Sequence, residues 1–429
     1  MGSLVLIFFI STAVMLLIGV PISITIGASS LLYILMGGIQ QLIAIQKLFA
    51  GINAVALLAI PFFILAGDLM NTGGIAKRLV RLANAVIGNM TGGLAIVTVL
   101  GCMFFAAISG SGVATAAALG SIMIPAMVNN GYDKVFATSV VASASPIGVI
   151  IPPSISFVIY GVLTGTSIAD LYLAGIPAGI IVGTALLIVS YIICKKRGYK
   201  GAVQAEMSKH EKIKELWLAF KDSIWALGTP VILIGGVFGG IFTPTESAVV
   251  AVVYAIIVGL FFYREIKLRD LPKVILGSAK TAAKIMFIIA NASLFAYVLT
   301  YEKIPQMVVK GLLGITTNEF LLVLIINIIM LIAGTFMETS AILIIMVPLL
   351  MPVLNQIGMD LTHFGIIATT NTAIGLLTPP FGVCLFTSSS VAKIPVEVLS
   401  RKIMPFLIAM IIALMIITYI PQSIMFLVK

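Results

Sequence analysis

Long apolar stretches dominate the chain, and short polar connectors separate them. Several stretches reach the roughly 20 apolar residues that a membrane-crossing helix needs. The first, Leu4 to Leu32, follows Met-Gly-Ser without a basic segment and is too long for a signal peptide, so we expect it to remain as a first helix. The pattern predicts an all-α integral membrane protein.

Composition excludes a water-soluble fold, because 61% of the 429 residues are apolar and only 9% are charged. The formal net charge is +10. The basic residues lie in short connectors, which is where the positive-inside rule places them. No basic face with interleaved aromatic residues occurs, so we expect membrane lipid and no nucleic acid as a partner.

Sequence signatures of catalysis are absent. The chain has no GxxxxGKS or GxxxxGKT phosphate loop, and its two histidines form no HExxH metal motif. Its three cysteines are scattered and predict no disulfide framework. These features disfavour an enzyme and nucleotide-driven transport.

An internal repeat becomes visible when the chain is shifted by 227 residues. The shift aligns seven identical residues between Pro125 and Pro153, and Pro, Gly or Asp account for six of them. It also places Pro152-Pro153 on Pro379-Pro380, and Ser109–Thr115 on Phe336–Ile342. The chain is therefore a duplicated unit.

Charge predicts how the two copies are oriented. The connector 195–221 holds eight Lys or Arg against three Glu, and 264–284 holds six basic residues, so both should face the cytoplasm. Two crossings, Ile224–Ile241 and Ser247–Phe262, fit between them. The first of these is an extra span, which predicts an inverted-topology repeat, a common plan of secondary transporters.

We expect three regions: a first repeat at 1–200, a cytoplasmic connector with an extra span at 201–245, and a second repeat at 246–429. Each repeat contains a re-entrant helical hairpin, at about 90–128 and 322–354. Each also contains a discontinuous helix, at about 135–162 and 363–390. The segment Gly37–Gly51 is either an interfacial segment or a loop.

Small and polar residues interrupt the apolar pattern twice in each repeat. One pair of interruptions, 106–115 and 334–340, predicts the tips of the hairpins. The other pair, 142–148 and 369–375, is followed in each case by Pro-Pro and predicts a broken helix. Free carbonyl and hydroxyl oxygens at such breaks suit Na⁺, and helix N-termini suit a carboxylate.

A plainer interpretation is that Ser, Thr and Gly only allow close helix packing. That interpretation suffices for a single string, but four strings paired by an exact repeat favour two cation sites near the middle of the membrane.

Three carboxylates lie near membrane depth, where ionisable residues are functional candidates. Glu338, in the second tip, would bind a cation or hold the tip in shape. Asp68 is interpreted as a buried structural acceptor, and Glu246 as a cap of the helix near Ser247. His363 is interpreted as a helix-start residue. The segments 71–89 and 302–313 are typical of interfacial helices.

Taken together, these segments resemble the large membrane subunit of tripartite ATP-independent periplasmic (TRAP) transporters, of the DctM or SiaM type. The resemblance extends over essentially the whole chain. The segments that carry it are 60–67 (IPFFILAG), 73–76 (GGIA), 109–116 (SGSGVATA), Ser145-Pro146 to Pro152-Pro153, 242–246 (FTPTE) and 375–382 with Thr378-Pro379-Pro380.

The resemblance implies an elevator mechanism, in which both hairpins and both broken helices slide against a scaffold. It implies coupling to Na⁺, a periplasmic substrate-binding protein (DctP or SiaP type) and a small membrane subunit (DctQ or SiaQ type). Because the chain begins directly with its first repeat, we expect a separate small subunit. The implied location is the bacterial inner membrane, and the implied substrates are carboxylates such as C4-dicarboxylates and sialic acid.

The resemblance also implies residues for two Na⁺ sites. The first comprises Ser109, Gly110, Ser111, Ser143, Ser145 and Gly148. The second comprises Gly334, Glu338, Thr339, Asn371, Thr372 and Gly375. The substrate would lie between them, against Ser111, Gly112, Thr115, Ser145, Pro146, Thr339, Ser340, Thr372 and Thr378.

The principal alternative is a self-sufficient carrier driven by H⁺ or Na⁺, which would transport without a binding protein. A membrane-embedded enzyme and a purely structural subunit are weaker alternatives, since neither accounts for four paired polar interruptions.

Overall fold

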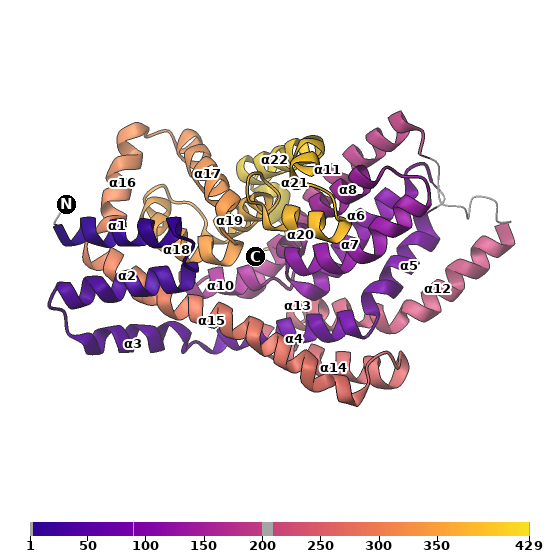
Figure 1. The fold of residues 1–429 in the computed structure, drawn as a ribbon, viewed down its shortest axis with the longest axis horizontal. Helices are drawn as coiled ribbons and strands as arrows, with labels where there is room; N and C mark the ends of the chain where they lie inside the picture. Colours follow the sequence, from indigo (N-terminus) through magenta and orange to yellow (C-terminus); the bar gives the residue numbers. More distant parts are fainter. Residues whose placement is uncertain (1–2, 89, 200–208, 429) are drawn as a thin grey trace.

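The computed structural model describes residues 3–88, 90–199 and 209–428 (Figure 1). Within these ranges the chain is built from helices and short loops, without a β-strand. Nine helical segments are long and apolar enough to cross a membrane among the described residues. The all-α integral membrane fold is confirmed.

The helices of the first part of the chain are α1 (Ser3–Leu17), α2 (Ile22–Met36), α3 (Gln41–Ile52), α4 (Ala59–Thr72), α5 (Ile75–Ile87), α6 (Gly93–Ser109), α7 (Gly112–Asn129), α8 (Lys134–Ala144), α9 (Ile147–Ile150), α10 (Ile155–Thr164) and α11 (Ile168–Arg197). Those that follow are α12 (Lys209–Pro230), α13 (Gly236–Phe238), α14 (Pro244–Ile257), α15 (Leu271–Tyr301), α16 (Ile304–Ile315), α17 (Glu319–Phe336), α18 (Thr339–Gln356), α19 (Leu361–Gly375), α20 (Val383–Ala392), α21 (Val396–Lys402), α22 (Met404–Tyr419) and α23 (Gln422–Met425).

The first apolar run is not one helix, so the prediction for Leu4–Leu32 was wrong. It forms α1 and α2, which pack against each other. Gly19 adopts a positive φ of 82°, and the Val20 amide bonds to the Met15 carbonyl, which closes the end of α1. Pro21 then precedes α2, because it cannot continue the hydrogen-bond ladder of α1.

The 227-residue repeat reappears in the helix boundaries. The hairpin α6–α7 at 93–129 corresponds to α17–α18 at 319–356, and α8 and α19 begin 227 residues apart, at Lys134 and Leu361. Both starts are capped alike: the Asp133 carboxylate accepts from the Phe136 amide, and Asp360 from the His363 amide, each at 2.8 Å. His363 therefore lies in the first turn of α19.

Each repeat contains a helix that stops and resumes. In the first repeat α8 ends at Ala144, the single turn α9 follows, and α10 resumes after Pro152-Pro153. In the second repeat α19 ends at Gly375 and α20 resumes after Pro379-Pro380. Both Pro-Pro bonds are cis. Neither Pro-Pro stretch is part of a continuous helix, because proline lacks the amide that the ladder needs.

The two repeats interlock. Helix α7 of the first hairpin packs on α20 of the second repeat, and α18 of the second hairpin packs on α10 of the first. The first hairpin lies in the right half of Figure 1 and the second in the left half, with α19 and α20 between them. Each hairpin is thus supported by the resumed helix of the other repeat.

A second group of helices surrounds α15, the longest helix, which packs against α2, α3 and α4. The segment 37–51, left open as loop or interfacial, mostly forms α3. Gly51 lies against α15 so closely that an added Cβ would fall 2.5 Å from the Ser293 Cβ.

The extra span begins as α12 and ends after a π-helical turn, Val231–Gly235, at α13. Residues 200–208 of the basic connector lie outside the described ranges. Helix α14 starts at Pro244, three residues earlier than expected, and Glu246 and Thr243 form a reciprocal capping box. The predicted capping role of Glu246 is therefore confirmed.

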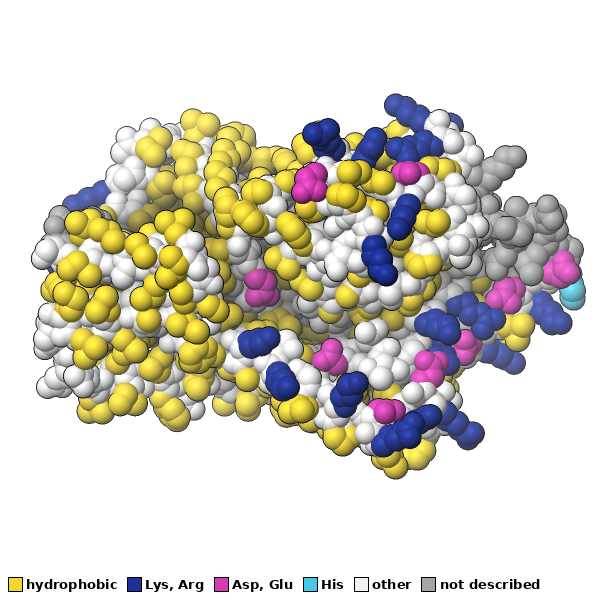
Figure 2. Space-filling model, viewed as in Figure 1, with side chains coloured by type: hydrophobic (Ala, Val, Ile, Leu, Met, Phe, Trp, Pro, Cys, Tyr) yellow, Lys and Arg dark blue, Asp and Glu magenta, His cyan; other side chains and the backbone are white. Residues whose placement is uncertain are grey.

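Charged side chains are unevenly distributed. In Figure 2, Lys and Arg gather over the right half of the molecule, whereas hydrophobic side chains cover the left half, where α1, α2 and α3 lie. This asymmetry is what the positive-inside rule expects of a chain whose basic connectors share one side of a membrane.

Candidate substrate and cation site

A cavity of about 400 Å³ lies where the two hairpin tips meet α4, α10 and α15. Both tips contribute to its wall, Ser109 to Gly112 from the first and Glu338 to Ser340 from the second. Val149, beside the first helix break, and Leu376, beside the second, complete it. The cavity therefore brings together both hairpin tips and residues that adjoin both helix breaks.

The first hairpin tip is a tight turn tied together by its hydroxyl groups. Gly110 ends α6 with a φ of 58°, a conformation that glycine adopts without strain. The Thr115 hydroxyl donates to the Ser111 carbonyl at 2.8 Å and lies 3.1 Å from the Ser109 Oγ. The Ser111 hydroxyl caps α7 by accepting from the Ala114 amide.

This tip touches the first helix break. A Cβ added to Gly148 would lie 2.6 Å from the Thr115 Oγ1 and 2.8 Å from the Ser111 carbonyl oxygen. A Cβ added to Gly110 would lie 2.8 Å from the carbonyl oxygen of Pro153. Only glycine allows the two backbones to approach this closely, so main-chain oxygens from tip and break are concentrated in one place.

The first tip also reaches the second repeat. An added Cβ on Gly112 would contact the Cys384 Sγ at 3.0 Å, and both the Leu376 Cδ1 and the Pro146 Cα at 3.4 Å. Gly112 therefore lies between the two helix breaks.

The second tip is built differently. Glu338 occupies the position before α18, and the Ser340 hydroxyl donates to its Oε1 at 3.3 Å. Gly334, in the last turn of α17, lies against Gly375, where α19 ends. The second tip and the second break are thus in backbone contact, as the first pair is.

Asn371 and Thr372 are partly committed to bonds within the protein. The Asn371 amide donates to the Asn327 carbonyl oxygen at 2.8 Å and to the Asn327 Oδ1 at 2.7 Å. The Thr372 hydroxyl donates to the Ala368 carbonyl at 2.9 Å. The hydrogen-bond donors of both side chains are thus used within the protein, while the lone pairs on their oxygen atoms stay available.

Several buried oxygens around the breaks have no hydrogen-bond partner among the described residues, including the Ser143 Oγ, the Thr339 Oγ1 and the Asn371 Oδ1. An unpaired buried polar atom is costly, and oxygen ligands suit a hard cation. Among the described residues no group of three or more His, Cys, Asp or Glu forms a metal cluster. The oxygens present therefore fit Na⁺ better than a transition metal.

The predicted site residues divide into two sets. Those that line the cavity are Ser109, Gly110, Ser111, Gly112, Glu338, Thr339 and Ser340. Those that stand behind the wall, in the tips and breaks, are Thr115, Ser143, Ser145, Pro146, Gly148, Gly334, Asn371, Thr372, Gly375 and Thr378. In that second set the Ser145 hydroxyl donates to the Ala142 carbonyl and the Thr378 hydroxyl to the Ile374 carbonyl.

Four polar residues that line the cavity were not among the predicted site residues: Asp68, Asn71, Ser156 and Thr281. Asp68 is the structural acceptor expected of it, since the Ser278 hydroxyl donates to its Oδ2 at 2.6 Å. Its carboxylate belongs to the cavity wall as well. The signal was the spacing of Asp68 and Asn71, which places both on one face of the otherwise apolar α4.

A duplicated, many-spanning helical protein with hairpin tips and interrupted helices around one cavity has the architecture of a secondary transporter. Comparison with known proteins makes the class specific. Residues 9–423 match the family "Tripartite ATP-independent periplasmic transporter, DctM component". The chain belongs to this family.

Named relatives include the isethionate TRAP transporter permease protein DctMQ of Oleidesulfovibrio alaskensis, 43% identical over 96% of this chain. This chain spans 65% of that protein. The C4-dicarboxylate TRAP transporter large permease protein DctM of Pseudomonas aeruginosa is 45% identical over 87% of this chain and 86% of its own. The sialic acid TRAP transporter large permease protein SiaM of Vibrio cholerae is 39% identical over 88% of this chain and 87% of its own.

Two solved transporters share the fold at low identity. YdaH of Alcanivorax borkumensis matches with a TM-score of 0.60 and 13% identity, over 88% of this chain and 87% of its own. MtrF of Neisseria gonorrhoeae matches with a TM-score of 0.57 and 15% identity, over 97% of this chain and 95% of its own.

Membership of the family makes the chain a multi-pass inner-membrane transport subunit, not an enzyme. The name of the family denotes a tripartite system, which implies a small membrane subunit and a periplasmic binding protein as partners.

Proposed function

We propose that the chain imports an organic acid together with Na⁺, using the cavity between the two hairpin tips as the substrate site. One observation carries the proposal: a single cavity of about 400 Å³ is walled by both tips. Hydroxyl oxygens and helix N-termini surround it, and these groups suit cations and carboxylates respectively.

Two Na⁺ ions would bind behind the cavity wall, one at each contact between a tip and a break. Ser109, Gly110, Ser111, Ser143, Ser145 and Gly148 would hold the first. Gly334, Glu338, Thr339, Asn371, Thr372 and Gly375 would hold the second. The unpartnered oxygens of Ser143, Thr339 and Asn371 support this assignment, because a bound cation would satisfy them.

The substrate would be a carboxylate, or a related acid, that touches Ser111, Gly112, Thr339 and Ser340 at the helix N-termini. No Lys or Arg lines the cavity among the described residues. A bound anion would therefore be held by amide dipoles, hydroxyl groups and the neighbouring Na⁺ ions. Relatives are named for C4-dicarboxylate, sialic acid and isethionate, all of which are acids.

Movement would be of the elevator type. The hairpins α6–α7 and α17–α18 and the broken helices would move together past the group around α15. Interlocked packing of the two repeats supports this division. A periplasmic binding protein would deliver the acid, and a small membrane subunit would complete the assembly.

Uptake into proteoliposomes tests the proposal. Vesicles holding this chain and its small subunit would receive candidate binding proteins and labelled acids under an imposed Na⁺ gradient, H⁺ gradient or none. We expect uptake only with Na⁺ and a binding protein. Uptake without the binding protein would indicate the self-sufficient carrier, and uptake driven equally by H⁺ would contradict Na⁺ coupling.

Variants then test the site. Ser145→Leu and Thr372→Leu should abolish Na⁺-dependent uptake while membrane insertion stays intact, because the added side chains would fill the space around the proposed ions. Ser121→Leu, at an exposed position of α7, is the control. Undiminished uptake in both site variants would contradict the two pockets.

A further inference from the structure

An apolar groove of about 710 Å³ lies away from the transport cavity, between α5, α6 and α12. Its main side chains are Leu82 and Val86 of α5, Leu100 and Phe104 of α6, and Trp217 and Phe220 of α12. None of the described residues that line it is charged. In a membrane-spanning chain, such a groove is open to an apolar guest.

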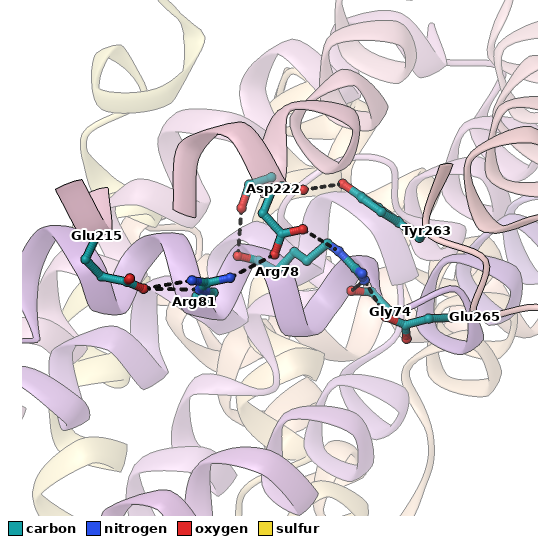
Figure 3. Close-up of polar contacts among 8 residues, drawn as sticks. Gly74, Arg78, Arg81, Glu215, Asp222, Tyr263 and Glu265 are labelled. Carbon is teal, nitrogen blue, oxygen red and sulfur yellow. Dashed lines mark hydrogen bonds and ion pairs between the residues drawn. The ribbon is translucent and has the colours of Figure 1, made fainter. Parts of the chain in front are cut away.

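Ion pairs hold two walls of this groove in place (Figure 3). The Arg81 guanidinium bonds to the Glu215 carboxylate at 3.0 Å and to the Asp222 carboxylate at 3.2 Å, which ties α5 to α12. Arg78 adds bonds to Asp222 and Glu265 and lies over the Tyr263 ring at 3.7 Å. The α5 and α12 walls of the groove are therefore held together.

Two lysines of α12 lie at the rim of the groove. Lys214, Trp217 and Lys221 are three and four residues apart, so they share one face of α12. The Lys221 Nζ lies 5.2 Å from the centre of the Trp217 ring, a cation–π contact. Neither lysine pairs with a carboxylate among the described residues, whereas Glu215 and Asp222 are already paired with arginines.

Tryptophan beside lysine is the arrangement found where a helix passes through the headgroup level of a membrane. An apolar slot with two ammonium groups beside it matches the two chemical parts of a phospholipid, an acyl chain and a phosphate. Another protein helix would require carboxylates to match this rim.

We propose that the groove binds an anionic phospholipid, with one acyl chain between α5, α6 and α12 and its phosphate on Lys214 and Lys221. This goes beyond the proposed transport function, because the lipid is neither substrate nor coupling ion. The bound chain would fill the space between α6, which belongs to the first hairpin, and α12, which belongs to the extra span.

The test uses the full chain in detergent, supplied with phosphatidylglycerol or with phosphatidylcholine of the same acyl chains. Native mass spectrometry counts bound lipid, and the thermal unfolding midpoint reports stabilisation. We expect selective binding of phosphatidylglycerol. Lys214→Gln with Lys221→Gln should weaken that binding roughly 25-fold, at about fivefold for each lysine near an anionic headgroup.

Two further variants make the test specific. Val86→Trp, which fills the groove without touching the lysines, should also remove the bound lipid. Lys280→Gln with Lys284→Gln removes the same charge from exposed positions on α15 and should leave lipid binding unchanged.

Equal binding of the two lipids would overturn the proposal, as would equal effects of the two lysine pairs or lipid retention in Val86→Trp. An assembled complex in which the small subunit covers the groove and no lipid remains would overturn it as well. None of these outcomes depends on transport, so the lipid site and the proposed function fail separately.

Discussion

Gly334 and Gly375 are in direct backbone contact, so close that a Cβ added to Gly375 would fall 2.5 Å from the Gly334 Cα. This contact joins the end of α17 to the end of α19, and with it the second tip to the second helix break. The corresponding contact in the first repeat joins Gly148 to Ser111 and Thr115. Close approach of tip and break is the feature that gathers oxygen atoms in both repeats.

Gly375→Ala should therefore displace the second tip. Because the new methyl group meets backbone and no flexible side chain, we expect destabilisation by about 1–3 kcal/mol and loss of uptake. A thermal melt in detergent and a proteoliposome assay measure the two effects. Gly277→Ala, on α15 where an added Cβ meets nothing within 4 Å, is the matched control. A wild-type melting midpoint in Gly375→Ala would contradict the contact.

Ser143→Ala and Thr339→Val remove hydroxyl groups that are buried and have no hydrogen-bond partner in the described part of the chain. A hydroxyl without a partner contributes nothing favourable to folding, so both variants should fold normally. If these oxygens bind Na⁺, the Na⁺ concentration for half-maximal uptake should rise several-fold. Ser190→Ala removes an equally buried and unpartnered hydroxyl from α11 and should change nothing. Unchanged Na⁺ dependence in both site variants would show that these two hydroxyl oxygens do not bind Na⁺.

Asn327 and Asn371 should depend on each other. Asn371→Ala leaves the Asn327 Oδ1 buried without its donor, which costs about 1–3 kcal/mol. The double variant Asn327→Ala with Asn371→Ala should lose less than the sum of the two single variants, by about 0.5–3 kcal/mol. Unfolding midpoints of the four proteins give this coupling. Strict additivity would show that the pair does not interact.

Asp222→Ala should loosen α5 from α12. The carboxylate accepts from both Arg78 and Arg81, and the Arg78 side chain is only 15% exposed, so we expect a loss of about 1–3 kcal/mol. Asp133→Asn provides the comparison, since its 3.6 Å pair with Arg197 is more exposed and should contribute less than about 1 kcal/mol. The reverse order of the two effects would contradict the role given to Asp222.

Much of this architecture can be predicted from the repeat in the sequence and from its proline and glycine positions. Proline and glycine mark the breaks, because each changes what the backbone can do locally, and the repeat places hairpins and breaks without any structure. Glycine and proline also separate α1 from α2, at Gly19-Val20-Pro21. There, the length of the apolar run alone led to the wrong prediction of a single helix.

The cavity wall was less predictable. Asp68 and Thr281 come from helices distant in sequence from either tip, and only packing brings them to the cavity. Similarly, the use of the Asn371 amide by Asn327 depends on how α17 meets α19, which no local pattern specifies. Spacing predicts which residues share a helix face, but it does not predict which helix that face will meet.

Because α7 packs on α20 and α18 packs on α10, the hairpin of each repeat depends on a helix of the other repeat for its packing. A displacement of one hairpin is therefore passed to the resumed helix of the opposite repeat, on which that hairpin packs. The two proposed ion sites would therefore be coupled mechanically, and an ion bound at one would restrain the backbone around the other.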